Sequence, residues 1–119
     1  MSPSPQDRAA RIAAELAGLG LALPGTLAQR RVRCGWPGCR CHADPPQLHG
    51  PYWHWTRKRA GKTISRLVPD DQVDDYRQWI GNHRRLRELV AELEDLTLAV
   101  ADERSGYQAR ARRTRQSTA

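Results

Sequence analysis

The chain has 119 residues, 39% of them hydrophobic and none of them phenylalanine, which fits one small domain with a thin core. Its formal net charge is +7, and no stretch approaches the ~20 apolar residues of a membrane span. The first residues are polar and lack the apolar run of a signal peptide. We therefore expect a cytoplasmic protein without a membrane contact, in which cysteine thiols stay reduced.

The charges are segregated along the chain. Residues 26–68 contain nine basic residues and one acid, whereas residues 69–103 contain ten acids and four basic residues. Residues 104–119 contain five arginines, no acid and no apolar face, so we predict a disordered basic tail there. This segregation favours a polyanionic partner. The use of 18 arginines against two lysines is also compatible with a compositional bias of the genome.

The N-terminal segment has the features of a short helix. Ser4 suits the N-cap and Pro5 the first helical position, and glycines at positions 18 and 20 end the pattern. Helical spacing is kept by the apolar residues Ala9, Ile12, Ala13 and Leu16. We predict a short amphipathic helix over about residues 5–17.

Two segments in the middle of the chain predict a β-hairpin. Residues 52–58 and 62–68 are rich in aromatic and β-branched side chains, and Arg59-Ala60-Gly61 between them fits a short turn. Residues 26–33 fit either a third, edge strand or a helical turn. Alternation predicts one face with Trp53, Trp55 and Arg57 and the other with Tyr52, His54, Thr56 and Lys58. Both faces mix polar and apolar groups, so the sequence leaves open which of them covers the core.

A long helix is predicted from Asp70 to about residue 103. Asp70 suits its N-cap, and the acids that follow complement the positive end of the helix dipole. We expect its first turns to pack on the hairpin. Its later turns carry a stripe of leucines, Leu86, Leu89, Leu93 and Leu96. This stripe would pair with the N-terminal helix, with a second copy as a homodimer, or with a partner protein.

All three cysteines lie within eight residues of a turn-rich loop, at Cys34, Cys39 and Cys41. Three thiolates and one imidazole form a ligand set that closes a structural zinc site. His49 is our choice for the fourth ligand, because the seven residues between Cys41 and His49 form a free loop. His42 itself follows Cys41 directly, and adjacent side chains seldom converge on one ion. Thiolates also bind iron, and three reduced thiols without a metal are the simplest alternative.

The motifs of common zinc- or cysteine-dependent enzymes are missing from the sequence. It contains neither the H-x-E and P-C-x-x-C pattern of zinc deaminases nor the C-x-x-C pair of thioredoxin-like proteins. Asp44 is the only carboxylate near the cysteines, and a metal-dependent hydrolase would have to use it. We therefore predict a protein that is not an enzyme.

Nine residues carry a resemblance to a known family. Cys34-Gly35-x-Pro37-x-Cys39-x-Cys41, followed by His49-Gly50-Pro51-Tyr52, resembles the motif of small uncharacterised bacterial and archaeal proteins. The resemblance covers about residues 23–100, and Trp36 departs from it where a basic residue is common. That family is often associated with transposases and other mobile elements and has no assigned activity. The resemblance therefore implies a Cys3His site with His49 and supplies no reaction.

Five basic residues are concentrated on the predicted hairpin: Arg57, Lys58, Arg59, Lys62 and Arg66. A two-stranded ribbon fits the DNA major groove, where arginine and lysine contact phosphates or guanine edges. Trp53 and Trp55 would alternatively stack on unpaired bases or lie in the core. An ordinary solvated strand face is the simplest alternative.

We predict one α+β domain over residues 1–103. It would consist of a short N-terminal helix, a metal-stapled cysteine loop, a basic hairpin of two or three strands and a long C-terminal helix. The predicted function is that of a non-enzymatic accessory protein with structural zinc that binds nucleic acid, with DNA as the expected type, and is associated with mobile elements. The alternative is a protein-interaction adaptor that uses the leucine stripe.

Overall fold

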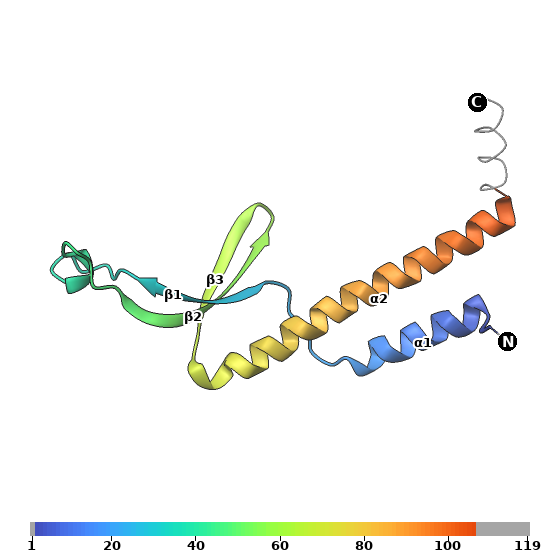
Figure 1. Ribbon diagram of the computed structural model, residues 1–119, viewed down its shortest axis with the longest axis horizontal. Coiled ribbons are helices and arrows are strands. Elements are labelled where there is room, and N and C mark those ends of the chain that lie inside the picture. Colours follow the sequence, from blue (N-terminus) through green and yellow to red (C-terminus); the bar gives the residue numbers. More distant parts are fainter. Residues whose placement is uncertain (1, 107–119) are drawn as a thin grey trace, which may run out of the picture. The chain divides into compact units, whose positions relative to one another are not determined.

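A computed structural model describes residues 2–106, so residues 107–119 of the predicted basic tail lie outside the described part of the chain. The predicted α+β class is confirmed, and the elements follow one another as shown in Figure 1. In chain order they are helix α1 (Pro5–Gly18), strand β1 (Thr26–Val32), the 3-10 turn η1 (Arg40–His42), strand β2 (His49–Arg59), strand β3 (Lys62–Val68), the 3-10 turn η2 (Asp70–Gln72) and helix α2 (Val73–Ser105).

The chain forms two compact units. The sheet unit contains residues 21–84, and thus the three strands, the cysteine loop and the beginning of α2. The helical unit combines α1 with the part of α2 from Arg85 onward. No helix among residues 2–106 has the length and apolar content that crossing a membrane requires.

The sheet is antiparallel, with the strand order β1-β2-β3. Residues 26–32 are thus a strand, which resolves the alternative that their sequence left open. The hairpin turn is one residue shorter than predicted, because Arg59 still pairs with Lys62. Its two residues, Ala60 and Gly61, have φ angles of 52° and 77°. Positive φ at both positions matches the right-handed twist of the flanking strands.

The core of the sheet unit lies between the tryptophan face of the sheet and the first turns of α2. Trp55, Val68 and Val73 are buried there. Partly buried residues pack around them: Leu23, Leu27, Trp53, Ile64, Tyr76 and Ile80. The face with Trp53 and Trp55 therefore covers the core, which the sequence did not decide. The expected packing of the first turns of α2 on the hairpin is confirmed.

The segment before β1 is fixed on this core by three hydrogen bonds. The indole Nε1 of Trp55 donates to the carbonyl of Pro24 over 2.9 Å. The backbone N–H of Leu23 donates to the carbonyl of Trp79, and the side-chain amide of Asn82 donates to the carbonyl of Leu21. The last two of these bonds join α2 to a much earlier segment of the chain, and Asn82 and Leu21 are 61 residues apart.

Helix α2 begins three residues later than predicted. Asp70 does not cap it, because residues 70–72 form a 3-10 turn whose N-cap is Pro69. The backbone N–H of Gln72 donates to the carbonyl of Pro69 over 2.9 Å and closes this turn. Asp74 and Asp75 lie in the first turn of α2 and complement its dipole there.

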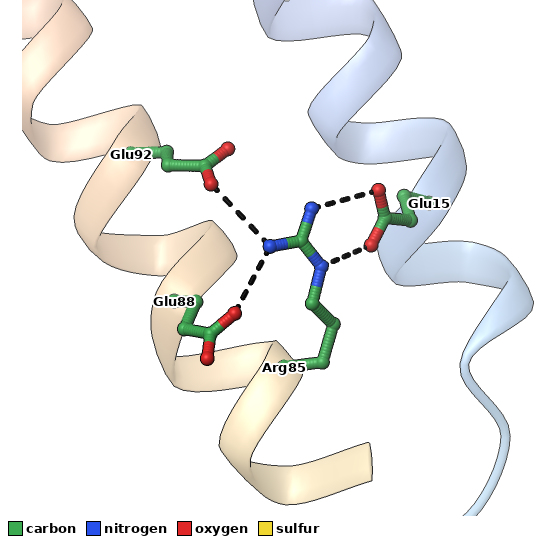
Figure 2. Close-up of polar contacts among 4 residues, drawn as sticks. All are labelled: Glu15, Arg85, Glu88 and Glu92. Atoms are coloured by element: carbon green, nitrogen blue, oxygen red, sulfur yellow. Dashed lines mark hydrogen bonds and ion pairs between the residues drawn. The ribbon is translucent and has the colours of Figure 1, made fainter. Parts of the chain in front are cut away.

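The helical unit pairs α1 with the later turns of α2. Ser4 and Asp7 form a reciprocal capping box at the start of α1. Figure 2 shows the guanidinium of Arg85, on α2, binding the carboxylate of Glu15, on α1, as well as Glu88 and Glu92 on its own helix. The ion pair between Arg85 and Glu15 joins the two helices of the unit, and Glu88 and Glu92 are further charged partners of Arg85 within α2.

The leucine stripe of α2 is mostly turned away from solvent. Leu89 is 1% exposed, Leu86 and Leu96 are half-buried, and Leu93 is 36% exposed. Leu96 and Ile12 of α1 line the same hollow between the two helices. Pairing of the stripe with α1, one of the three expected arrangements, is therefore present within the chain.

Candidate metal centre and basic surface

The pairing of β1 with β2 brings the two ends of the cysteine loop together. Val32, the last residue of β1, pairs with His49, the first residue of β2, after a register irregularity between Arg30 and Val32. Cys34 lies two residues beyond β1 and is therefore close to His49. The sheet thus positions the outer two of the four predicted ligands.

The turns of the loop position the other two predicted ligands. The backbone N–H of Cys39 donates to the carbonyl of Trp36, and that of His42 donates to the carbonyl of Cys39. The 3-10 turn η1 then carries Cys41 back toward the strands. Glycine and proline at positions 35, 37 and 38 permit this compact path, as the sequence indicated.

The four predicted ligand atoms converge on one point. The Sγ atoms of Cys34, Cys39 and Cys41 and a ring nitrogen of His49 all lie within 4.8 Å of one another. Cys34 Sγ is 3.6 Å from Cys41 Sγ, and Cys39 Sγ is 3.2 Å from His49 Nε2. A tetrahedral site with metal–sulfur bonds of about 2.3 Å has sulfur–sulfur edges of about 3.8 Å. The cluster has nearly these dimensions and could hold a metal ion.

The environment of the cluster favours thiolate at one cysteine and thiol at another. The backbone N–H of Cys41 is the main cause that lowers the pKa of Cys39 to about 6, and contacts with Cys34 and His49 act in the same direction. Burial raises the pKa of Cys41, whose side chain is 0% exposed. A metal ion takes thiolate ligands, so its binding would displace the remaining thiol protons.

His42 is close to the cluster but is not among its four members, in agreement with the sequence argument. Its Nε2 lies 2.7 Å from the backbone carbonyl oxygen of Cys34 and donates to it. This bond fixes the backbone of a candidate ligand residue from across the loop. His42 is therefore a positioning residue, and Asp44, the nearest carboxylate in the sequence, is exposed and outside the cluster.

The basic residues of the hairpin are divided between its two faces. Arg57 pairs with Ile64 and Arg59 with Lys62, and Arg66 lies opposite Trp55. Four of the five predicted residues thus share the tryptophan face, and Lys58 lies on the other. Exposed side chains are found at Lys58, Arg59, Lys62 and Arg66. Arg57 is half-buried, and its Nε atom has no hydrogen-bond partner.

Two further arginines, which the sequence did not single out, lie beside Trp53. The guanidinium carbon of Arg77 lies 5.0 Å from the centre of the Trp53 ring. Arg77 and Arg84 line one hollow together with Trp53. Their spacing of seven residues, two turns of one helix, is the only sequence signal that could have grouped them.

Comparisons with known proteins give one match. The sequence model of a family described as a domain of unknown function (DUF6788) matches residues 5–78, which is more than half of the chain. These residues include all four members of the cysteine–histidine cluster and the whole hairpin. No curated protein and no solved structure matches the chain significantly.

Proposed function

The chain belongs to the DUF6788 family, whose function is unknown, and from its geometry we propose that it is a non-enzymatic nucleic-acid-binding protein with a structural zinc ion. The observation that carries the nucleic-acid proposal is the charge of the hairpin. Residues 49–68 contain five arginines or lysines and no acid, and four of these five side chains are exposed. An uncompensated basic ribbon of this kind suits a polyphosphate.

Zinc is the metal that the ligand set supports best. Three thiolates and one imidazole complete a four-coordinate structural site and leave no position for a substrate. The loop that holds the cluster has little regular structure of its own, apart from the three residues of η1. A bound ion would therefore hold the loop together, a role that backbone hydrogen bonds have in a helix or a sheet.

Elemental analysis of protein purified without added metal tests this assignment. We expect about one zinc ion per chain and loss of that ion in Cys39→Ser. Iron in place of zinc would change the metal but keep the structural role. A folded protein that contains neither metal would contradict the proposal.

In the proposed nucleic-acid complex the hairpin contacts the phosphate backbone. Lys58, Arg59, Lys62 and Arg66 would donate to phosphate oxygens, with the arginines able to do so in a bidentate manner. The cluster would hold the loop between β1 and β2 and so stabilise the base of the ribbon. The resemblance to proteins associated with transposases supports an accessory role in mobile elements, which the genes adjacent to the coding sequence would test.

Salt-dependent binding measurements test the hairpin directly. We expect the full-length protein to bind labelled DNA with an affinity that falls as salt rises. The slope of log K against log salt concentration should be about −4 or steeper, as four to five phosphate contacts predict. The double variant Lys62→Ala/Arg66→Ala should reduce the magnitude of this slope by about 2. Arg87→Ala, at an exposed position on α2, is the control for loss of positive charge. Equal effects of hairpin and control variants would argue against the proposal.

The alternative function, an adaptor that uses the leucine stripe, has less support. Leu89, at the centre of the stripe, is already buried within the chain. A partner protein would have to displace α1 or bind beside it, through Leu93 and its exposed neighbour Val90. Salt-insensitive binding to a protein, with no binding to DNA, would favour this alternative.

A further inference from the structure

A hollow of about 420 Å³ lies beside the core of the sheet unit. Its volume falls within the range of about 300–1,000 Å³ that is typical of ligand sites. Its apolar lining includes Leu27 and Ile80, and its polar and aromatic lining consists of Thr26, Trp53, Arg77 and Arg84. Gly81 contributes no side chain, and a Cβ atom there would meet nothing within 4 Å. The hollow therefore combines an aromatic ring, two guanidinium groups and free space.

The hollow carries positive charge without a carboxylate in its lining. Arg77 stacks on Trp53, with 5.0 Å between its guanidinium carbon and the ring centre. Its only ion pair in the described part of the chain is a 3.4 Å contact with Asp74, whose side chain is 96% exposed and thus well hydrated. Arg84 is exposed and has no ion pair among residues 2–106. Both arginines are therefore available to an anion.

A second hollow also lies at the start of β1, mainly against the other face of the hairpin. It measures about 360 Å³, and it shares Gly25 and Thr26 with the first. Its lining includes Arg57 and Lys58 and again no carboxylate. Thr56, Lys58 and Thr63 in its lining belong to the sheet face opposite Trp53, so the second hollow is a separate basic site.

We propose that the first hollow binds single-stranded nucleic acid, with one unpaired base beside Trp53 and Arg77 and an adjacent phosphate on Arg84. This inference rests on the proposed nucleic-acid function and adds the form of the strand. Unpaired bases stack on aromatic rings and on guanidinium planes, whereas the bases of a duplex have no free faces. Because Arg77 already lies over the Trp53 ring, a base would stack on the outer plane of its guanidinium or take its place on the ring. The phosphate beside a stacked base requires a cation, which Arg84 supplies.

The test compares single-stranded and duplex DNA with the full-length protein. The probes are a fluorescently labelled oligothymidylate and a labelled duplex of the same length, at one salt concentration. Arg84→Ala should weaken binding of the single strand about tenfold, as expected for loss of a charged hydrogen bond, with little change for the duplex. Trp53→Leu should weaken the single strand by about tenfold as well, because stacking contributes about 1–3 kcal/mol per base.

Matched controls separate the hollow from the net charge and from folding. Arg87→Ala removes the same charge from an exposed position that does not line the hollow, and it should affect both probes equally and weakly. Circular dichroism and metal content check that Trp53→Leu is folded. If that variant is not folded, the comparison of Arg84→Ala with Arg87→Ala decides alone. Thymidine monophosphate is the third ligand and should bind far more weakly than the strand.

Three results would overturn the inference: equal effects of Arg84→Ala and Arg87→Ala, equal losses for single strand and duplex in Arg84→Ala, or a monophosphate that binds as tightly as the strand. If the hairpin variant Lys62→Ala/Arg66→Ala still weakens binding in those cases, the proposed function stands without the single-strand site. If neither DNA form binds at low salt, the proposed function fails together with the inference.

Discussion

The Sγ atom of Cys39 lies 3.2 Å from Nε2 of His49, ten residues further along the chain. One of these residues comes from a turn in the loop, and the other is the first residue of β2, paired with Val32. The cluster therefore forms only when the loop is compact and the two strands are in register. A metal ion bound there would stabilise the loop and the sheet together.

Removal of the proposed zinc ion should lower the thermal stability of the protein. Ligand binding to the folded state alone adds about 4 kcal/mol when free metal exceeds its Kd about 1,000-fold. We expect a chelator to lower the Tm of the zinc-loaded protein by more than about 10 °C, measured by circular dichroism. The Cys39→Ser variant, which has lost a ligand, should not respond to the chelator. An unchanged Tm of the zinc-loaded protein would show that the metal does not support the fold.

Replacement of the positioning residue His42 should weaken metal binding without abolishing it. His42→Ala removes the 2.7 Å hydrogen bond to the carbonyl of Cys34, so the loop would hold this ligand less well. Loss of such supporting contacts typically costs about 10–100-fold in metal affinity. Competition with a chromophoric chelator measures the change. His83→Ala, on α2 and outside the cluster, is the control and should leave the affinity unchanged.

Gly25 should be intolerant of a side chain. Its φ angle is +126°, and a Cβ atom there would lie 2.6 Å from the carbonyl oxygen of Thr56 and against the indole of Trp55. We expect Gly25→Ala to reduce the free energy of unfolding by about 2–4 kcal/mol, from backbone strain and overpacking together. Gly81→Ala, in open space within α2, should be neutral or stabilising by up to about 1 kcal/mol. Urea denaturation compares the two, and equal effects would contradict this account.

The two leucines Leu89 and Leu98 should differ in their contribution to stability. Leu89 is 1% exposed and Leu98 is 62% exposed, on the same helix. Leu89→Ala should lower the free energy of unfolding by about 2–5 kcal/mol, and Leu98→Ala by less than about 0.5 kcal/mol. Sedimentation of both variants and of the parent protein would show whether the stripe also supports a homodimer. Equal stability of the Leu89→Ala and Leu98→Ala variants would contradict a core role of Leu89.

The contact between the two helices should weaken at acid pH. The hydrogen bond from Arg85 holds the pKa of Glu15 below its usual value of 4.5. A carboxyl with a lowered pKa contributes stability that is fully present above pH 4.5 and is lost as the pH falls through its folded pKa. The unfolding midpoint of the parent protein should therefore fall more steeply below pH 4.5 than that of Glu15→Gln. Glu94→Gln, at an exposed site without an ion pair in the described part of the chain, should keep the steep fall.

The sequence predicts features that depend on residues close together in the chain. The cysteine spacing predicted a metal cluster with His49, and the four side chains do converge. The aromatic and β-branched runs predicted the hairpin, because alternation and a glycine-containing turn are local signals. Strand β1 was ambiguous because it is an edge strand and four of its seven residues are exposed.

Features that depend on distant segments could not be predicted. The core face of the hairpin is decided by Val73 and the following turn of α2, which no alternation pattern contains. The hollow beside Trp53 combines residues of β1, β2 and α2 with Gly25, which precedes β1 and lies 59 positions before Arg84. Neither Arg77 nor Arg84 looks unusual within the charged sequence of the long helix, and only the fold places them beside a tryptophan.

Strands β1 and β3 form the two edges of the sheet, and each carries exposed positive charge, for example at Arg30 and Lys62. Open edges present unpaired N–H and C=O groups that invite pairing with another molecule, and like charges on an edge oppose such pairing. The cations therefore also protect the protein from edge-to-edge aggregation. Variants that remove several of them at once would lose solubility, whatever their effect on a phosphate ligand.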